Sequence, residues 1–304
     1  MSRFLVFFAS ILLSLSVFSQ TSHDFLLKGL QHFSGQQYQA AIEAFTKAIE
    51  LNPAQEEAWF KRGQANLELG RLNQASGDFT EVIALRPNHG EAYYFRALTG
   101  AKKGQPAEAL KDLNRALELD SALVQAYLLR AELGEKAGRN GEVMPDLNRA
   151  INLAPNNPNA YFLRARQFSK NGNFEKAYED LSHALALDPD HAEMRLERSQ
   201  ICMREGMFAQ AAEDLSSAID RGLDYADNYQ IRAQAFFQAE MYTEAIADYT
   251  MLINTFSRRT DQNYYQRGLS RILTNDLGGA CEDLNKAASL GHAEARKKAK
   301  EVCK

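Results

Sequence analysis

EAWFKRG, at residues 57–63, is followed by EAYYFRA at 91–97, QAYLLRA at 125–131 and NAYFLRA at 159–165. The spacing is 34 residues each time. Weaker copies follow at 195–199 and 229–233, another lies at 264–268 after one inserted residue, and one precedes the series at 25–29. A fixed period of this length predicts a repeat fold. We predict eight units, at residues 22–55, 56–89, 90–123, 124–157, 158–191, 192–225, 226–259 and 261–294.

Each unit has the pattern of two helices joined by a turn. In the second unit, Trp59, Gly63 and Leu67 share one helical stripe, and Gly70 marks the end of that helix. A second apolar stripe follows, and Pro87 stops it. The same punctuation recurs along the chain, so we predict an all-α protein made of helical hairpins.

The first 19 residues have the pattern of a secretory signal peptide. Arg3 supplies a positive charge, residues 4–18 are mostly apolar, and Ser19 is a small residue at a suitable cleavage position. The apolar run is shorter than the ~20 residues that a membrane-spanning helix needs, although an uncleaved anchor is the alternative. We therefore expect export, to the bacterial periplasm first and to full secretion second.

Composition and motifs exclude several classes of function. The net charge is −4 and the isoelectric point about 5.9, so a sequence-independent nucleic-acid binder is not expected. Six scattered histidines and three cysteines form no zinc-binding spacing, and no phosphate-binding loop or nucleophile elbow is present in the sequence. We expect no enzyme activity, no cofactor and no metal site.

The repeating residues closely resemble the tetratricopeptide repeat (TPR) family. The shared pattern is an aromatic residue, then Arg-Gly or Arg-Ala, then Gly-x-aromatic, then Ala-x-x-x-Phe or Leu, then Pro, over about 273 of the 304 residues. The resemblance implies an α-solenoid: a right-handed superhelix of antiparallel helix pairs. It also implies that the first helices line a concave groove that binds a peptide or a partner protein.

Two columns of residues have the properties of a packed core. One column is small, and the other, sixteen residues later, is large and apolar. Small side chains let paired helices approach closely, and the large ones fill the remaining space. The small column is Gly29, Gly63, Ala97, Ala131, Ala165, Ser199, Ala233 and Gly268, and the large one is Phe45, Phe79, Leu113, Leu147, Leu181, Leu215, Tyr249 and Leu284.

A third pattern is charged. Arginine recurs in units two to eight, and aspartate follows sixteen residues later in each. We predict a structural ladder of ion pairs, in which each aspartate contacts the arginine of its own unit or of the next. Unpaired arginines facing an anionic ligand are the alternative. The ladder is Arg62, Asp78, Arg96, Asp112, Arg130, Asp146, Arg164, Asp180, Arg198, Asp214, Arg232, Asp248, Arg267 and Asp283.

The candidate partner-binding groove is an apolar stripe on the face of the first helices that we expect to point away from the core. Large aromatic residues on an exposed surface are typical anchors for a partner. The alternative is that this stripe packs against neighbouring helices. Its members are Leu26, Phe60, Tyr94, Leu128, Phe162, Leu196 and Tyr265, with Gln230 as the polar exception.

The end of the chain is expected to cover the last repeat. Residues 295–304 continue as a helix with basic residues on one side and small apolar residues on the other, as a terminal cap requires. Cys281 and Cys303 are candidates for a disulfide in an oxidising compartment, or remain two free thiols. We expect Cys202 to be a buried thiol.

Two classes of function remain. The first is a non-catalytic scaffold that holds a peptide or partner protein in the groove, as the TPR resemblance implies. The second is a structural component of a cell-envelope complex that acts through its ends or its convex face, including self-association. The sequence leaves the partner and the oligomeric state open.

Overall fold

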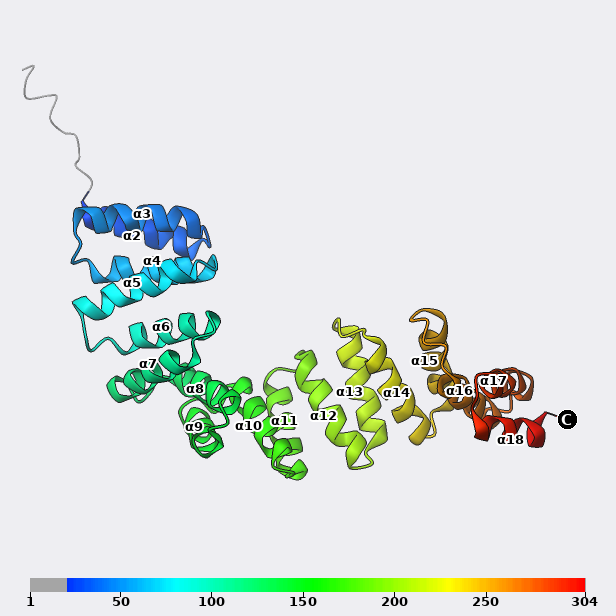
Figure 1. The fold of residues 1–304 in the computed structure, drawn as a ribbon. Helices are drawn as coiled ribbons and strands as arrows, with labels where there is room; N and C mark the ends of the chain where they lie inside the picture. Colours follow the sequence, from blue (N-terminus) through cyan, green and yellow to red (C-terminus); the bar gives the residue numbers. More distant parts are fainter. Residues whose placement is uncertain (1–20, 304) are drawn as a thin grey trace, which may run out of the picture. The chain divides into compact units, whose positions relative to one another are not determined.

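The computed structural model describes residues 21–303, so the expected signal peptide at residues 1–19 lies outside the described residues. Every regular element in the described range is a helix. The helices follow one another as antiparallel pairs joined by short turns, with the first and second helix of each pair side by side (Figure 1). The prediction of an all-α solenoid is confirmed.

The chain divides into two compact units, and the first extends to Leu153. It contains the four pairs of repeats one to four. These are α2 (Ser22–Ser34) with α3 (Tyr38–Leu51), α4 (Glu56–Glu68) with α5 (Leu72–Leu85), α6 (Gly90–Lys102) with α7 (Pro106–Leu119), and α8 (Val124–Lys136) with α9 (Asn140–Leu153).

The second compact unit begins at Ala154 and contains repeats five to eight and the cap. These are α10 (Pro158–Lys170) with α11 (Phe174–Leu187), α12 (Ala192–Arg204) with α13 (Phe208–Asp220), α14 (Ala226–Gln238) with α15 (Tyr242–Asn254), α16 (Asp261–Leu273) with α17 (Leu277–Ser289), and α18 (Ala293–Val302).

The turn within each pair depends on one residue with a left-handed backbone. After α4, Gly70 has φ 68°. The Gly70 amide donates to the Leu67 carbonyl at 3.0 Å and the Arg71 amide donates to the Asn66 carbonyl at 2.8 Å, which closes the helix end. Glycine fills the same position in the next four repeats, at residues 104, 138, 172 and 206. The turn glycines of the sequence therefore have a backbone reason.

Three repeats make the same turn without glycine. Gln36, Glu240 and Asn275 have φ values of 57°, 62° and 63°. A left-handed conformation places the Cβ of a non-glycine residue close to the following carbonyl oxygen, so these turns carry local strain. The turns of repeats one, seven and eight are thus less favourable than those of the repeats between them.

Small and large residues match in size across the helix pairs of repeats one to six. A Cβ added to Gly29 would lie 2.4 Å from ring atoms of Phe45, and one added to Gly63 would lie 2.8 Å from the ring of Phe79. The glycines therefore make room for phenylalanine rings. Repeats three to six have leucine at the large position and alanine or serine at the small one: Leu113 with Ala97, Leu147 with Ala131, Leu181 with Ala165, and Leu215 with Ser199.

The capping helix α18 covers the end of the second unit. It begins at Ala293, two residues before the expected boundary, and buries Ala295 and Ala299 in a cluster with Leu284 of α17. A disulfide joins Cys281 to Cys303, with their Cα atoms 5.6 Å apart. The cap is therefore attached to the last repeat both by apolar packing and by a covalent bond.

Candidate functional site

The arginines and aspartates of repeats two to eight form ion pairs, each within its own repeat. Arg62 Nη2 lies 2.7 Å from Asp78 Oδ1, and both side chains are mostly buried. Of the two pairings that the sequence allowed, the structure has the one within the same repeat. The other pairs, with their closest N–O distances, are Arg96–Asp112 at 2.8 Å, Arg130–Asp146 at 2.6 Å, Arg164–Asp180 at 2.8 Å, Arg198–Asp214 at 2.7 Å, Arg232–Asp248 at 2.7 Å and Arg267–Asp283 at 2.7 Å.

In each compact unit, arginines also reach back to the second helix of the preceding repeat. Arg62 Nη1 donates to Thr46 Oγ1 at 3.0 Å, and Arg130 Nη1 donates to Asn114 Oδ1 at 2.8 Å. Sequence reasoning missed this connection, although a hydroxyl or amide residue stands two positions after each of the seven aspartates. The further bonds are Arg96–Thr80 at 3.4 Å, Arg198–Ser182 at 3.2 Å, Arg232–Ser216 at 3.2 Å and Arg267–Thr250 at 3.1 Å.

An aromatic ring lies beside most of these guanidinium groups. Arg62 Cζ is 4.7 Å from the ring centroid of Trp59, and Arg232 Cζ is 5.0 Å from that of Tyr229. Repeat six has Arg195 instead of an aromatic residue, and Arg195 forms a second ion pair with Asp214 at 3.3 Å. The same aromatic contact occurs at Arg96–Tyr93, Arg130–Tyr127, Arg164–Tyr161 and Arg267–Tyr264.

These contacts give the ladder a structural role. The hydrogen bond to Asp112 raises the pKa of Arg96 above its ordinary value, although burial opposes it. The hydrogen bond to Asp214 does the same for the pKa of Arg198. A guanidinium that already contacts a carboxylate, a hydroxyl and an aromatic ring has little capacity left for an anionic ligand.

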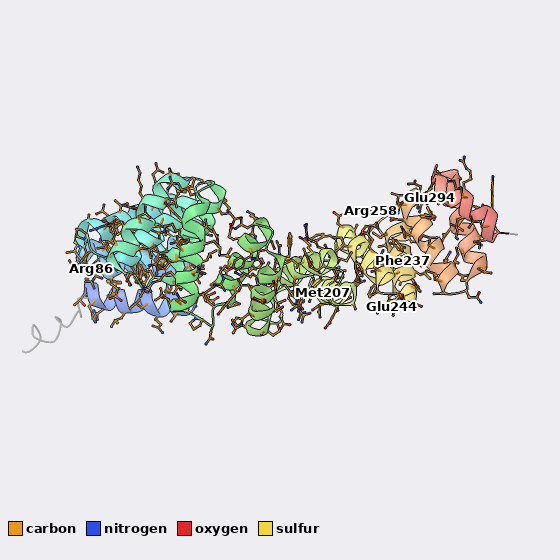
Figure 2. All side chains as sticks on the ribbon, turned by 90° about the horizontal axis from the view of Figure 1, so that it is seen from below. Arg86, Met207, Phe237, Glu244, Arg258 and Glu294 are labelled. Atoms are coloured by element: carbon orange, nitrogen blue, oxygen red, sulfur yellow. A yellow bond between two sulfur atoms is a disulfide. The ribbon has the colours of Figure 1, made fainter. Side chains whose placement is uncertain are left out.

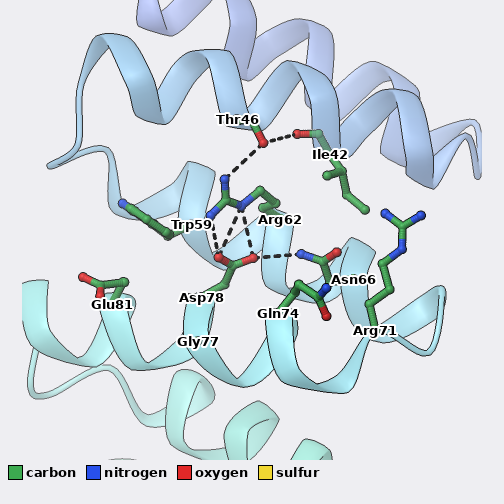
Figure 3. Close-up of a pocket in the computed structure, with 10 residues that line it drawn as sticks. All are labelled: Ile42, Thr46, Trp59, Arg62, Asn66, Arg71, Gln74, Gly77, Asp78 and Glu81. Carbon is green, nitrogen blue, oxygen red and sulfur yellow. Dashed lines mark hydrogen bonds and ion pairs between the residues drawn. The ribbon is translucent and has the colours of Figure 1, made fainter.

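A hollow of about 540 Å³ lies beside the ladder between α3 and α5, and side chains of α4 also line it. Arg62 and Asp78 face each other at its centre, and Trp59 lies at one side (Figure 3). Asn66 donates to Asp78 Oδ2 at 3.0 Å, so the polar groups in the middle of the hollow already bind one another.

The apolar stripe of the first helices is more buried than the groove prediction requires. Leu26, Phe60 and Leu128 are only 2%, 7% and 7% exposed, so their expected position on an open face is wrong. Phe60 packs between Phe79 and Phe95, at ring-centroid distances of 5.9 and 5.5 Å. The physical reason is seen at Phe60, where the second helix of its own repeat, α5, and the first helix of the next repeat, α6, both pack against the ring. Its other members, Tyr94, Phe162, Leu196 and Tyr265, are half-buried.

Histidines that cap helices account for part of this burial. His89 Nδ1 accepts from the Ala92 amide at 3.3 Å and caps α6, and its ring lies 4.9 Å from that of Phe60. Burial lowers the pKa of His89, and nearby Arg86 lowers it further, against the opposing carboxylate of Glu56. The same arrangement pairs His191 with Phe162 at 5.7 Å and His292 with Tyr265 at 4.1 Å, with these histidines capping α12 and α18.

A pocket of about 410 Å³ lies on the first-helix face of the second unit. Residues of three first helices, α12, α14 and α16, line it, together with Phe208 of α13 and Tyr249 of α15. Its apolar walls are Met203, Phe208 and Phe237, and Phe237 is labelled in Figure 2. Its polar lining is Gln234, Gln238 and Gln266, and the fully buried Tyr249 also lines it. The lining contains no charged residue.

Reactive groups are scarce in the described part of the chain. Residues 21–303 contain no cluster of three or more side chains suited to a metal ion, and no helix there has the length and apolar character to cross a membrane. Cys202 is a buried free thiol, and burial raises its pKa to about 11. At neutral pH it is therefore protonated and poorly nucleophilic.

Comparison with known families identifies the repeat. A family model described as a TPR repeat matches residues 29–70, and two described as tetratricopeptide repeats match residues 67–123 and 147–179. The chain contains tetratricopeptide repeats. Among curated proteins, none matches its sequence.

Solved structures show the same TPR fold at low sequence identity. The chain is similar to pilF of Pseudomonas aeruginosa, with 17% identity and a TM-score of 0.60 over 66% of this chain and 92% of that one. It is similar to PilW, a type IV pilus biogenesis factor, with 20% identity and a TM-score of 0.60 over 69% and 96%. It is also similar to YrrB, a TPR protein with an unusual peptide-binding site, with 22% identity and a TM-score of 0.51 over 64% and 98%.

TPR folds serve in general as non-catalytic scaffolds for protein–protein interaction. The TPR repeats therefore assign this protein to the broad class of interaction scaffolds with protein partners. In this TPR protein the charged groups of the ladder bind one another, as Arg198 and Asp214 do. The pocket lined by α12, α14 and α16 instead has glutamine amides that can hydrogen-bond a partner.

Proposed function

We propose that this TPR protein is a non-catalytic scaffold that binds a peptide or a partner protein on the face formed by its first helices. The observation that supports this most directly is the pocket lined by α12, α14 and α16. Its volume of about 410 Å³ is within the usual range of ligand clefts, roughly 300–1,000 Å³. Half-exposed aromatic walls beside uncharged polar groups are typical of protein recognition.

The opposite choice, binding through the second helices, has less support. The hollow between α3 and α5 contains charged groups, but its central Arg62 and Asp78 bind each other. A ligand there would have to break an ion pair that is mostly buried, which is costly. YrrB, whose fold is similar, is described as having a peptide-binding site, and a peptide is the partner class that we propose here.

A crosslinking experiment tests the face that binds. A photo-reactive amino acid is placed at Gln200 or Gln234, which are exposed residues of first helices, in the full chain in its native cell. Matched controls carry it at Glu213 and Ala247, which are exposed residues of second helices in the same unit. We expect one partner to be crosslinked from the first-helix positions only.

Other outcomes are informative against the proposal. If partners are crosslinked only from Glu213 or Ala247, the second-helix face binds and the proposal is wrong. If the crosslinked species is a second copy of this chain, the protein has a self-assembling structural role instead.

We also propose that the protein is exported. The pattern of residues 1–19 supports this, and the disulfide between Cys281 and Cys303 is of a kind that persists in oxidising compartments. Cell fractionation with mass spectrometry of the purified protein should find a chain that begins near Ser19 or Gln20 outside the cytoplasm. A full-length chain with three alkylatable thiols in the cytoplasm would contradict export.

A further inference from the structure

Tyr249 differs from every other residue in its column. The large positions of the other repeats have phenylalanine or leucine, so only Tyr249 has a polar group there. The side chain is fully buried, and its hydroxyl has no hydrogen-bond partner within the described residues. A buried hydroxyl without a partner lowers stability, and phenylalanine would fill the same space without that cost. The hydroxyl therefore needs another explanation.

The neighbouring small residue also sets Tyr249 apart. Repeats one and two place an aromatic ring over glycine, where a Cβ would come within 2.4 Å of Phe45. Repeat seven has Ala233 at that position, so the ring of Tyr249 cannot lie as that of Phe45 does. Tyr249 lines the pocket between α12, α14 and α16. The one residue that departs from its column therefore also lines the pocket.

The chemistry of the pocket is polar but uncharged. Gln234, Gln238 and Gln266 line it, and none of their side-chain amides hydrogen-bonds another described residue. Burial raises the pKa of Tyr249, and the charge of Asp248 raises it further, so the hydroxyl is neutral at physiological pH. The polar groups of the pocket are therefore one enclosed hydroxyl and three amides, each able to donate and to accept.

We infer that this pocket binds the carboxamide side chain of an asparagine or glutamine in an extended segment of the partner, with Tyr249 as its hydrogen-bonding partner. This inference rests on the proposed binding face. A carboxamide accepts from a hydroxyl while it donates to glutamine oxygens, so it satisfies the groups present. Because the Tyr249 hydroxyl is enclosed, binding requires a neighbouring long glutamine side chain to rotate away.

Other side chains fit this lining less well. A carboxylate or an ammonium group would lose its hydration without finding an opposite charge in the lining. A leucine would fill the apolar space between Phe208 and Phe237 but would leave the hydroxyl of Tyr249 without a partner. Selectivity for the carboxamide is therefore the distinguishing prediction.

The test uses a phage-displayed library of random peptides selected on the purified protein. The best synthetic peptide, and versions with its asparagine or glutamine replaced by glutamate or leucine, are titrated by calorimetry. We expect the carboxamide peptide to bind about tenfold more tightly than either replacement, a difference of about 1.4 kcal/mol. Tyr249→Phe should remove that preference, whereas Tyr225→Phe, at an exposed tyrosine, should not change it.

Three results separate the inference from the proposed function. Tyr249→Phe should have a thermal midpoint equal to or above that of wild type, and a clear decrease would mean that the hydroxyl has a structural partner and would overturn the inference. Binding that is lost in Gln234→Arg but unaffected by Tyr249→Phe overturns the inference and keeps the first-helix face. Binding that is insensitive to both variants, or no selected peptide at all, counts against both.

Discussion

The ladder and the pocket around Tyr249 differ in how they use polar groups. In the ladder, repeats two to eight have the same two charged residues, and each arginine contacts a carboxylate of its own repeat. In the pocket, the lining residues occur together once, and the hydroxyl of Tyr249 has no partner in the described residues. The ladder thus recurs from repeat to repeat and its polar groups bind one another. The pocket occurs once, and one of its polar groups has no hydrogen-bond partner in the described residues.

This difference indicates where stability and recognition are located. Contacts that recur at every repeat stabilise the stack, because each repeat packs only against its neighbours. A residue that departs from the repeat and leaves a polar group without a hydrogen bond lowers stability. Such departures are expected where a residue serves function instead, for example where a partner binds. Substitutions in the ladder should therefore lower stability, and substitutions in the pocket should change binding.

The largest expected effect is that of Asp214→Ala. Asp214 is fully buried and pairs with Arg198 at 2.7 Å and with Arg195 at 3.3 Å. Removing it leaves two mostly buried guanidinium groups without their carboxylate, and breaking a buried pair costs about 3–5 kcal/mol. Urea unfolding followed by circular dichroism should show a loss of this size, or separate unfolding of the repeats around α13.

The matched control is Asp190→Ala. Asp190 also pairs with an arginine, Arg221, but its side chain is 80% exposed. We expect no measurable change in unfolding, because exposed pairs are screened by water and salt. Equal losses in the two variants would contradict a stabilising role that depends on burial.

The second prediction concerns size matching between the small and large columns. Gly29→Ala places a Cβ about 2.4 Å from the Phe45 ring and should cost about 1–3 kcal/mol through overpacking. Adding Phe45→Leu recreates the alanine and leucine pair of Ala97 and Leu113, so the double variant should recover part of the loss. Chemical denaturation of the four chains of this cycle measures the coupling. Simple additivity would mean that the columns do not match in size, and Ala233 would then place no restriction on the ring of Tyr249.

The fold could be predicted from the sequence because its main signals are periodic. The helix pairs, the turn glycine Gly70 and the pairing of Arg62 with Asp78 all follow from a spacing that recurs in the chain. The bond from Arg62 to Thr46 has the same spacing in the opposite direction, and it was missed because threonine, asparagine and serine share the position.

The candidate site could be predicted only in part. The period identifies Phe60 as one of a column, but it does not show that His89 of the following repeat covers it. The burial of Phe60 depends on the angle between successive repeats, and this angle cannot be read from the sequence. Tyr249 was assigned correctly to the packed column, but only the structure shows that its hydroxyl lacks a partner beside Gln234 and Gln266.

The third prediction is a loss of stability at low pH through His89. Its pKa is lowered in the folded chain, chiefly by burial, so the folded state favours the neutral ring that caps α6 through Nδ1. The stability that His89 contributes is present above the unfolded pKa of about 6.5 and is lost as the pH falls through the lower folded value. The thermal midpoint should therefore decrease from about pH 7.5 to about pH 5.5, on either side of that unfolded pKa.

The control is His89→Asn, which keeps a capping side chain that does not titrate, so the thermal midpoint of this variant should depend less on pH. An unchanged pH dependence would show that His89 is not responsible.

The smallest expected effect is a gain in stability from Glu240→Gly, in the turn that follows the pocket helix α14. Glu240 has φ 62°, a conformation that costs a non-glycine residue about 1 kcal/mol, and glycine removes that cost. The opposite change, Gly206→Ala at the equivalent turn of repeat six, should destabilise by a similar amount, because the backbone there has φ 75°. No atom lies within 4 Å of the added Cβ, so the backbone conformation is the only cost of this substitution. Urea unfolding of both variants measures the two shifts in stability.

Neither variant alters the lining of the pocket, so the binding of a selected peptide should be unchanged in both. A change in binding with Glu240→Gly alone would show that the strained turn helps to position Phe237 and Gln238, and that the departures of repeat seven from the common pattern form one functional unit.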